Sequence, residues 1–92
     1  MTMLPADERD AAMSRISLTV HPQDNVATLL DFAVEERTTH DGLQLQGAVP
    51  FGHKVARQAI ALGQPVIKYG VAIGTATADI TPGEHVHVHN CR

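Results

Sequence analysis

The sequence predicts a small all-β domain, a barrel of short strands with at most one short helix. Short runs of Val, Ile, Leu and Thr alternate with polar residues, which is the period of half-buried strands. Glycine, proline, asparagine and aspartate interrupt these runs every ~8–12 residues. The chain has 92 residues, 43% of them hydrophobic, with three aromatic residues and no tryptophan, so we expect one modest aliphatic core.

The first third of the chain is predicted to contain a tail and two strands. Residues 1–14 mix both charges without periodicity, and we expect a flexible N-terminal tail before a folded domain over residues 15–92. Residues 16–20 alternate apolar and polar side chains and predict a strand, which ends at the turn-forming residues that follow. Residues 26–33 are also predicted to form a strand, although their Ala and Leu fit a helix.

Three more strands and one ambiguous segment follow. Residues 43–46 alternate strictly and predict a short strand. Residues 55–60 fit either one helical turn or a strand, because six residues cannot settle the period. Residues 65–69 and 71–80 predict two further strands, with Gly74 marking a bulge or a close approach of another backbone segment.

A short internal repeat occupies the last third of the chain. Residues 60–66 and residues 80–86 both have the pattern Ile-x-x-Gly-x-x-Val, at an offset of 20 residues. Glycine accepts a positive φ, and Ile and Val favour strands. Each copy is therefore predicted to form a β-turn that leads into a strand.

A histidine ladder (His85, His87 and His89) alternates with valines at the C-terminal end. On one continuous strand these imidazoles would share a face. Neighbouring members would lie about 6.6 Å apart along the strand and the outer pair about 13 Å, so only an adjacent pair is expected to reach one metal ion. A further ligand would come from His53 or from a partner. The competing interpretation is a solvated strand face whose imidazoles only form hydrogen bonds.

Charge and cysteine content exclude several classes of protein. A net charge of −3 with scattered Lys and Arg offers no basic surface to nucleic acid. The single cysteine, Cys91, excludes an internal disulfide and a zinc site built on paired thiolates. No stretch approaches the ~20 apolar residues of a membrane span. We expect a cytoplasmic protein that binds neither nucleic acid nor membranes, and the small core favours a homo-oligomer or a subunit.

Several motifs, taken with their joint spacing, resemble a known family. They are Asp24-Asn25-Val26-Ala27, Gly52-His53-Lys54-x-Ala56, Ile60-x-x-Gly63-x-x-Val66-Ile67-Lys68-Tyr69-Gly70, and Asp79-Ile80-x-x-Gly83-Glu84-His85-Val86-His87-x-His89-Asn90. Over residues 16–90 the chain resembles the N-terminal SAF-type domain of the altronate dehydratase family. The resemblance implies a β-clip (SAF-like) fold that works with a much larger catalytic region, which removes water from a sugar acid.

The same resemblance implies a function for the chain. We expect the small subunit, or N-terminal module, of a sugar-acid dehydratase, inactive alone and sharing a divalent Fe²⁺ or Mn²⁺ ion with a larger catalytic subunit. A related sulfolactate sulfo-lyase also has small subunits of this type, so sulfite elimination is one alternative. A non-catalytic module that binds a carbohydrate acid or a partner is the other.

The chemistry of dehydration selects the candidate residues. The reaction needs a base for the α-proton, an acid for the departing hydroxide, and positive charge near the developing enolate. His53 and Lys54, on a loop opened by Gly52, are the candidate catalytic residues, and the alternative is a tight turn with an exposed lysine. Lys68 is the candidate ligand for the substrate carboxylate. The candidate metal ligands are the members of the histidine ladder, His85, His87 and His89.

Overall fold

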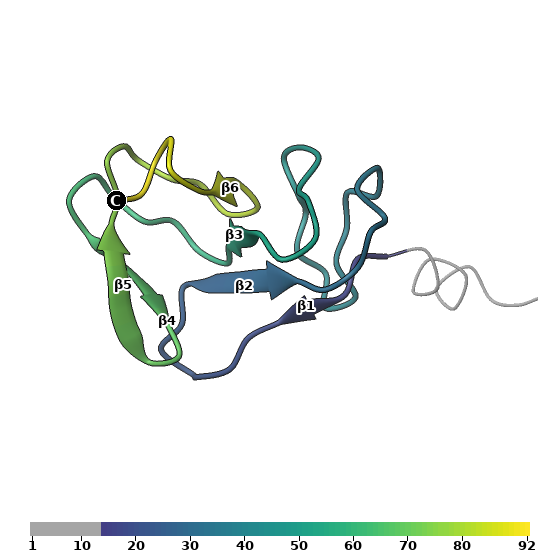
Figure 1. Cartoon of the computed structure of the whole chain (residues 1–92), viewed down its shortest axis with the longest axis horizontal. Coiled ribbons are helices and arrows are strands. Elements are labelled where there is room, and N and C mark those ends of the chain that lie inside the picture. Colours follow the sequence, from purple (N-terminus) through teal and green to yellow (C-terminus); the bar gives the residue numbers. More distant parts are fainter. Residues whose placement is uncertain (1–13) are drawn as a thin grey trace, which may run out of the picture.

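The computed structural model describes residues 14–92, so the tail predicted for residues 1–14 lies almost entirely outside the described part (Figure 1). Six antiparallel strands and no helix occur in that part. They are β1 (Ser17–Leu18), β2 (Val26–Leu29), β3 (Lys54–Ala56), β4 (Pro65–Lys68), β5 (Val71–Thr75) and β6 (His85–Val86). The predicted all-β class is confirmed. Residues 14–92 hold no helix that could cross a membrane.

The strands form two sheets. One sheet has the order β1-β2-β3-β6, and the other is the hairpin of β4 and β5. Figure 1 shows the hairpin beside the end of β2 at which that strand begins. Two apolar clusters lie on opposite faces of the larger sheet, because side chains alternate along each strand. Val26 of β2 enters the cluster that also packs against the hairpin, and its neighbour Ala27 enters the other.

Several strands are shorter than the sequence pattern predicts. The prediction for residues 26–33 is wrong beyond Leu29, where the side chain of Asp31 accepts hydrogen bonds from the backbone N–H groups of Ile16 (2.6 Å) and Ala33 (2.8 Å). Backbone donors captured by a side chain are lost to the strand ladder. The predicted strand at residues 43–46 is also wrong, since only Gln44 forms an isolated bridge there.

The alternatives left open at residues 55–60 and at Gly74 are decided by the structure. Only the first part of residues 55–60 belongs to a strand, β3, and no helical turn forms. At Gly74 both expectations hold, because the β4–β5 register shifts nearby and a Cβ on this residue would lie 2.7 Å from the carbonyl oxygen of Arg92. The predicted strand over residues 71–80 ends at Thr75.

The internal repeat is also a structural repeat. Ile60 and Ile80 exchange two backbone hydrogen bonds, of 2.9 and 2.7 Å, and both side chains are buried. The turn glycines Gly63 and Gly83 both have a φ of 85°. The two copies therefore face each other across one antiparallel bridge and place β4 and β6 in equivalent positions.

Asp24 and Asn25 join the hairpin to the larger sheet. The amide of Asn25 donates to the carbonyl of Pro65 (3.0 Å) and accepts from the N–H of Ile67 (2.7 Å). Asp24 accepts from the N–H of Gly70 at 2.8 Å. Both side chains are buried, so this motif stabilises the fold through backbone groups of β4 and its turn.

Candidate functional site

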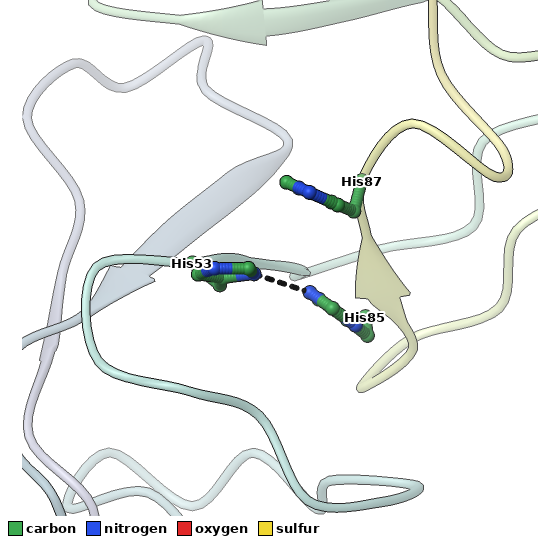
Figure 2. Close-up of side chains that lie close together, drawn as sticks. All are labelled: His53, His85 and His87. Carbon is green, nitrogen blue, oxygen red and sulfur yellow. Dashed lines mark hydrogen bonds between the residues drawn. The ribbon is translucent and has the colours of Figure 1, made fainter.

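The pairing of β3 with β6 brings three histidines together. In this antiparallel register Val55 lies opposite His85, and continuing it by two residues sets His53 opposite His87. Side chains two residues apart on a strand share a face, so all three imidazoles project to the same side. We call His53, His85 and His87 the histidine cluster. Figure 2 shows their rings turned toward one another from the β3 and β6 segments.

The distances within the histidine cluster suit a shared ligand. His53 Nδ1 lies 2.9 Å from His85 Nε2, and the ring centroids of His53 and His87 are 4.5 Å apart. One ligand nitrogen from each residue lies within 4.8 Å of the others. Two imidazole nitrogens bound to one ion at ~2.1 Å can be at most ~4.2 Å apart, so small side-chain rotations would bring all three onto one ion.

His89 does not belong to this cluster, because the ladder is not one strand. The expectation of a continuous strand is wrong: β6 ends at Val86 and the chain turns over residues 87–90. The side-chain Oδ1 of Asn90 accepts a hydrogen bond from the N–H of His87 at 2.9 Å, in place of a strand partner. The ring of His89 is still 5.6 Å from that of His85, and its role as a metal ligand stays a prediction.

Two imidazoles of the cluster, those of His85 and His87, have a lowered pKa, which favours their neutral form. Partial burial, and after it the positive charges of neighbouring histidines and Lys54, lowers the pKa of His85 below its usual value. The pKa of His87 is lowered by the same causes, desolvation first and then the charges of His53 and Lys54. Neutral imidazole is the form that binds a metal ion or accepts a proton. Both roles are therefore open to His85 and His87.

The two candidate lysines lie in different places. Lys54 opens β3 beside the histidine cluster, where its charge acts on His85 and His87. Lys68 ends β4, with its ammonium 4.9 Å from the centroid of the Tyr69 ring. Figure 1 shows the turn that follows β4 at the opposite side of the molecule from β6. The structure therefore brings Lys54 to the histidines and does not bring Lys68 there, and substrate binding by Lys68 stays a prediction.

Two polar residues around the cluster received no role from sequence reasoning. Asn90 is only 2% exposed, and its Nδ2 donates to the carbonyl of His85 (2.9 Å) and to Glu84 Oε2 (3.2 Å). Glu84 Oε1 accepts from the N–H of Thr81 at 3.0 Å, and this bond, followed by that from Asn90, keeps the pKa of Glu84 below its usual value against the effect of burial. An asparagine at the end of an alternating run is a turn signal that could have revealed this contact.

Comparison with known proteins supports the family suggested by the motifs. The sequence model described as "Altronate/galactarate dehydratase SAF domain" matches residues 15–92. The chain belongs to this family. The matched SAF domain includes every member of the histidine cluster, together with Lys54, Glu84 and Asn90.

Three relatives show how this SAF domain occurs elsewhere. It is 41% identical over 76 residues to the altronate dehydratase of Bacillus subtilis (strain 168), and 47% identical over 76 residues to that of Escherichia coli (strain K12). Each match covers 79% of this chain and only 15% of the relative. It is also 47% identical over 49 residues to the (2R)-sulfolactate sulfo-lyase subunit alpha of Chromohalobacter salexigens, a match that covers 53% of this chain and 52% of that subunit. The chain thus spans about 15% of the length of the altronate dehydratases it matches.

Proposed function

We propose that this SAF domain is the small subunit, or N-terminal module, of an altronate-type sugar-acid dehydratase, and that it completes an active site with a larger catalytic chain. The observation that carries the proposal is the histidine cluster, beside which Lys54 lies opposite Val86, the residue between His85 and His87. The length of the altronate dehydratases supports a division of labour, because most of their chain has no counterpart in this domain. The proposal places the complex in the cytoplasm.

The histidine cluster and Lys54 would supply two of the functions that dehydration needs. A neutral imidazole can take the α-proton of a hydroxy acid, and a lysine can stabilise the negative charge that develops next to the carboxylate. His53 and Lys54 are adjacent in sequence but lie on alternate sides of the β3 segment. The base and the cation therefore lie on different faces at the start of β3, and the larger chain would have to hold the substrate at that end of the strand, where both can reach it.

A divalent metal ion, Fe²⁺ or Mn²⁺, belongs to the same proposal. His53, His85 and His87 would hold it, and further ligands would come from the larger chain or the substrate. Three imidazoles suit iron better than manganese, magnesium or calcium, which prefer oxygen ligands, so Mn²⁺ would take more of its ligands from the larger chain or the substrate. When bound, the ion would act as a Lewis acid on a substrate oxygen. A lone pair given to a metal cannot also take a proton, so in the metal-bound state the base comes from outside the cluster.

Reconstitution with the larger chain tests the proposal. Altronate dehydration is measured with this chain alone, with the larger chain alone, and with both together. We expect turnover only from the pair, and full activity from this chain alone would refute the subunit assignment. In the pair, His87→Ala should lower kcat about 100-fold or more, because it removes a positioned acid–base group or, in the metal-bound state, a ligand of the ion. His40→Ala is the matched control, since His40 is exposed and lies outside the cluster.

A sulfo-lyase is the second candidate. The matched relative from Chromohalobacter salexigens is itself a separate subunit, and the match covers about half of it rather than a small fraction. Sulfite release from sulfolactate by the reconstituted pair, without dehydration of altronate, would select this function. A purely binding role would give a third pattern, in which His87→Ala leaves turnover unchanged and weakens assembly of the two chains.

A further inference from the structure

The two copies of the internal repeat provide an internal comparison of the same turn with and without histidines. Each turn makes the same two backbone hydrogen bonds to a partner residue. In the first copy Gly63 N–H donates to Ala76 O (2.8 Å), and Ala76 N–H donates to Gln64 O (2.9 Å). In the second copy Gly83 N–H donates to Ala56 O (2.8 Å), and Ala56 N–H donates to Glu84 O (2.9 Å). The two turns therefore share these backbone hydrogen bonds. Any feature present in only one copy serves something other than the turn.

The carboxylate of Glu84 is such a feature, because the first copy has the amide of Gln64 at this position. In the first copy Gln64 Oε1 accepts the N–H of Ala61 at 3.0 Å, and in the second Glu84 Oε1 accepts the N–H of Thr81 at 3.0 Å. A neutral amide oxygen is thus sufficient to close this turn. The carboxylate of Glu84 adds a second acceptor, Oε2, which the turn itself does not use.

That second oxygen binds Asn90, which has no equivalent in the first copy. Twenty residues before Asn90 the chain has Gly70, which lacks a side chain. Asn90 Nδ2 donates to Glu84 Oε2 (3.2 Å) and to the carbonyl of His85 (2.9 Å), while its Oδ1 accepts the N–H of His87 (2.9 Å). The amide of Asn90 therefore holds the backbone on both sides of Val86, at the two ladder residues that enter the cluster.

We infer that Glu84 and Asn90 form a positioning pair that sets the imidazoles of His85 and His87 against His53. The inference rests on the proposed function of the histidine cluster and extends it to the residues that orient the cluster. β6 has two residues, and beyond Val86 the backbone of His87 is held by Asn90 instead of a strand. Partners that orient ligand histidines commonly control the affinity of a site although they touch neither metal nor substrate.

Two substitutions separate this role from the turn. In Glu84→Gln the new side-chain oxygen can still close the turn, as Gln64 does, but its NH₂ group faces the NH₂ group of Asn90. If the amide of Asn90 flips to restore that bond, it loses the bonds to the His85 carbonyl and the His87 N–H. Asn90→Ala removes all three bonds at once. Gln64→Glu is the matched control, because it places the carboxylate in the copy that has no asparagine.

Ring contacts in the full metal-free chain provide the first readout. The rings of His53 and His87 have centroids 4.5 Å apart, close enough for nuclear Overhauser effects between their protons. We expect these effects to weaken in Glu84→Gln and Asn90→Ala and to persist in Gln64→Glu. Glu84→Gln should still unfold in one cooperative urea transition, with a midpoint lowered only by the lost hydrogen bonds of Asn90, and ring contacts measured without urea then separate a moved ring from a lost fold. Undiminished ring contacts in both Glu84→Gln and Asn90→Ala would overturn the inference.

Cobalt binding provides the second readout and distinguishes the two proposals. Each chain is titrated with Co²⁺ and followed by visible absorption. We expect the wild type and Gln64→Glu to bind alike, and Glu84→Gln and Asn90→Ala to bind about 10-fold more weakly or worse. Equal affinity and equal spectra in all four chains would overturn the positioning role. If the wild type binds no Co²⁺ but the ring contacts respond as expected, the metal part of the proposed function fails and the positioning pair is supported.

Discussion

Gly83→Ala should lower the free energy of unfolding much more than Gly63→Ala does, although both glycines have a φ of 85°. A Cβ at Gly83 would lie 1.9 Å from the carbonyl oxygen of Gln44, whereas a Cβ at Gly63 would meet nothing within 4 Å. The left-handed conformation costs alanine about 1–2 kcal/mol at either position. At Gly83 the overlap involves backbone, and Gln46 N–H also bonds the carbonyl of Gly83 at 3.0 Å, so the two segments cannot simply separate.

Forced repacking of this kind typically adds about 1–3 kcal/mol. Gly83→Ala should therefore lower the free energy of unfolding by about 2–5 kcal/mol in total, and Gly63→Ala by about 1–2 kcal/mol. A small domain has only about 5–15 kcal/mol of stability, so the first change is a large fraction of it. Urea unfolding followed by far-ultraviolet circular dichroism measures both values. Equal losses, within about 0.5 kcal/mol, would show that the close approach to Gln44 does not constrain Gly83.

Three further changes test other contacts. Asn25→Ala should lower the free energy of unfolding by about 1–3 kcal/mol, because a donor and an acceptor on the β4 backbone lose their partners; an unchanged urea midpoint would contradict this. Asp31→Asn should cost about 3 kcal/mol in the same assay, because it leaves the fully buried guanidinium of Arg15, which pairs with Asp31 at 2.7 Å, without a counter-charge; Arg15→Met leaves only the part-exposed carboxylate of Asp31 and should cost less, and the reverse order would refute the reasoning. The pKa of His85 is lowered by folding, so the folded chain binds fewer protons than the unfolded one, and stability should fall as pH drops below about 6.5. His85→Gln should flatten that dependence in chelator-treated protein, and an unaltered slope between pH ~7 and ~5 would exclude His85 as its source.

The positions of strands were predicted better than their lengths. Alternation and turn residues locate β1, β2, β4 and β5 correctly, because the period of a strand is a local property. Their ends depend on contacts with distant side chains. Asp31 ends the segment after Leu29 by binding the N–H of Ile16, and no feature of residues 26–33 announces that partner.

The histidine cluster shows the same contrast between what the local sequence predicts and what contacts with distant residues decide. His53 was predicted as a catalytic residue and as one possible extra metal ligand, yet the β3–β6 register makes it a full member of the cluster, while the turn held by Asn90 leaves His89 out. Spacing along one segment predicts which side chains share a face. It says nothing about which residue of another segment lies opposite, since that register is set by the packing of the whole sheet.

The sequence by itself determined the all-β class, the turns at Gly63 and Gly83, the family, and the presence of imidazoles able to act as bases or ligands. Local conformational preference and motif spacing carry this information, and they need no knowledge of the fold. The tertiary structure alone decided which three histidines meet, that Lys54 joins them while Lys68 does not, and that Glu84 and Asn90 hold the turn behind them. These relations join residues up to 34 positions apart, as His53 and His87 are, and only a formed sheet brings such residues into contact.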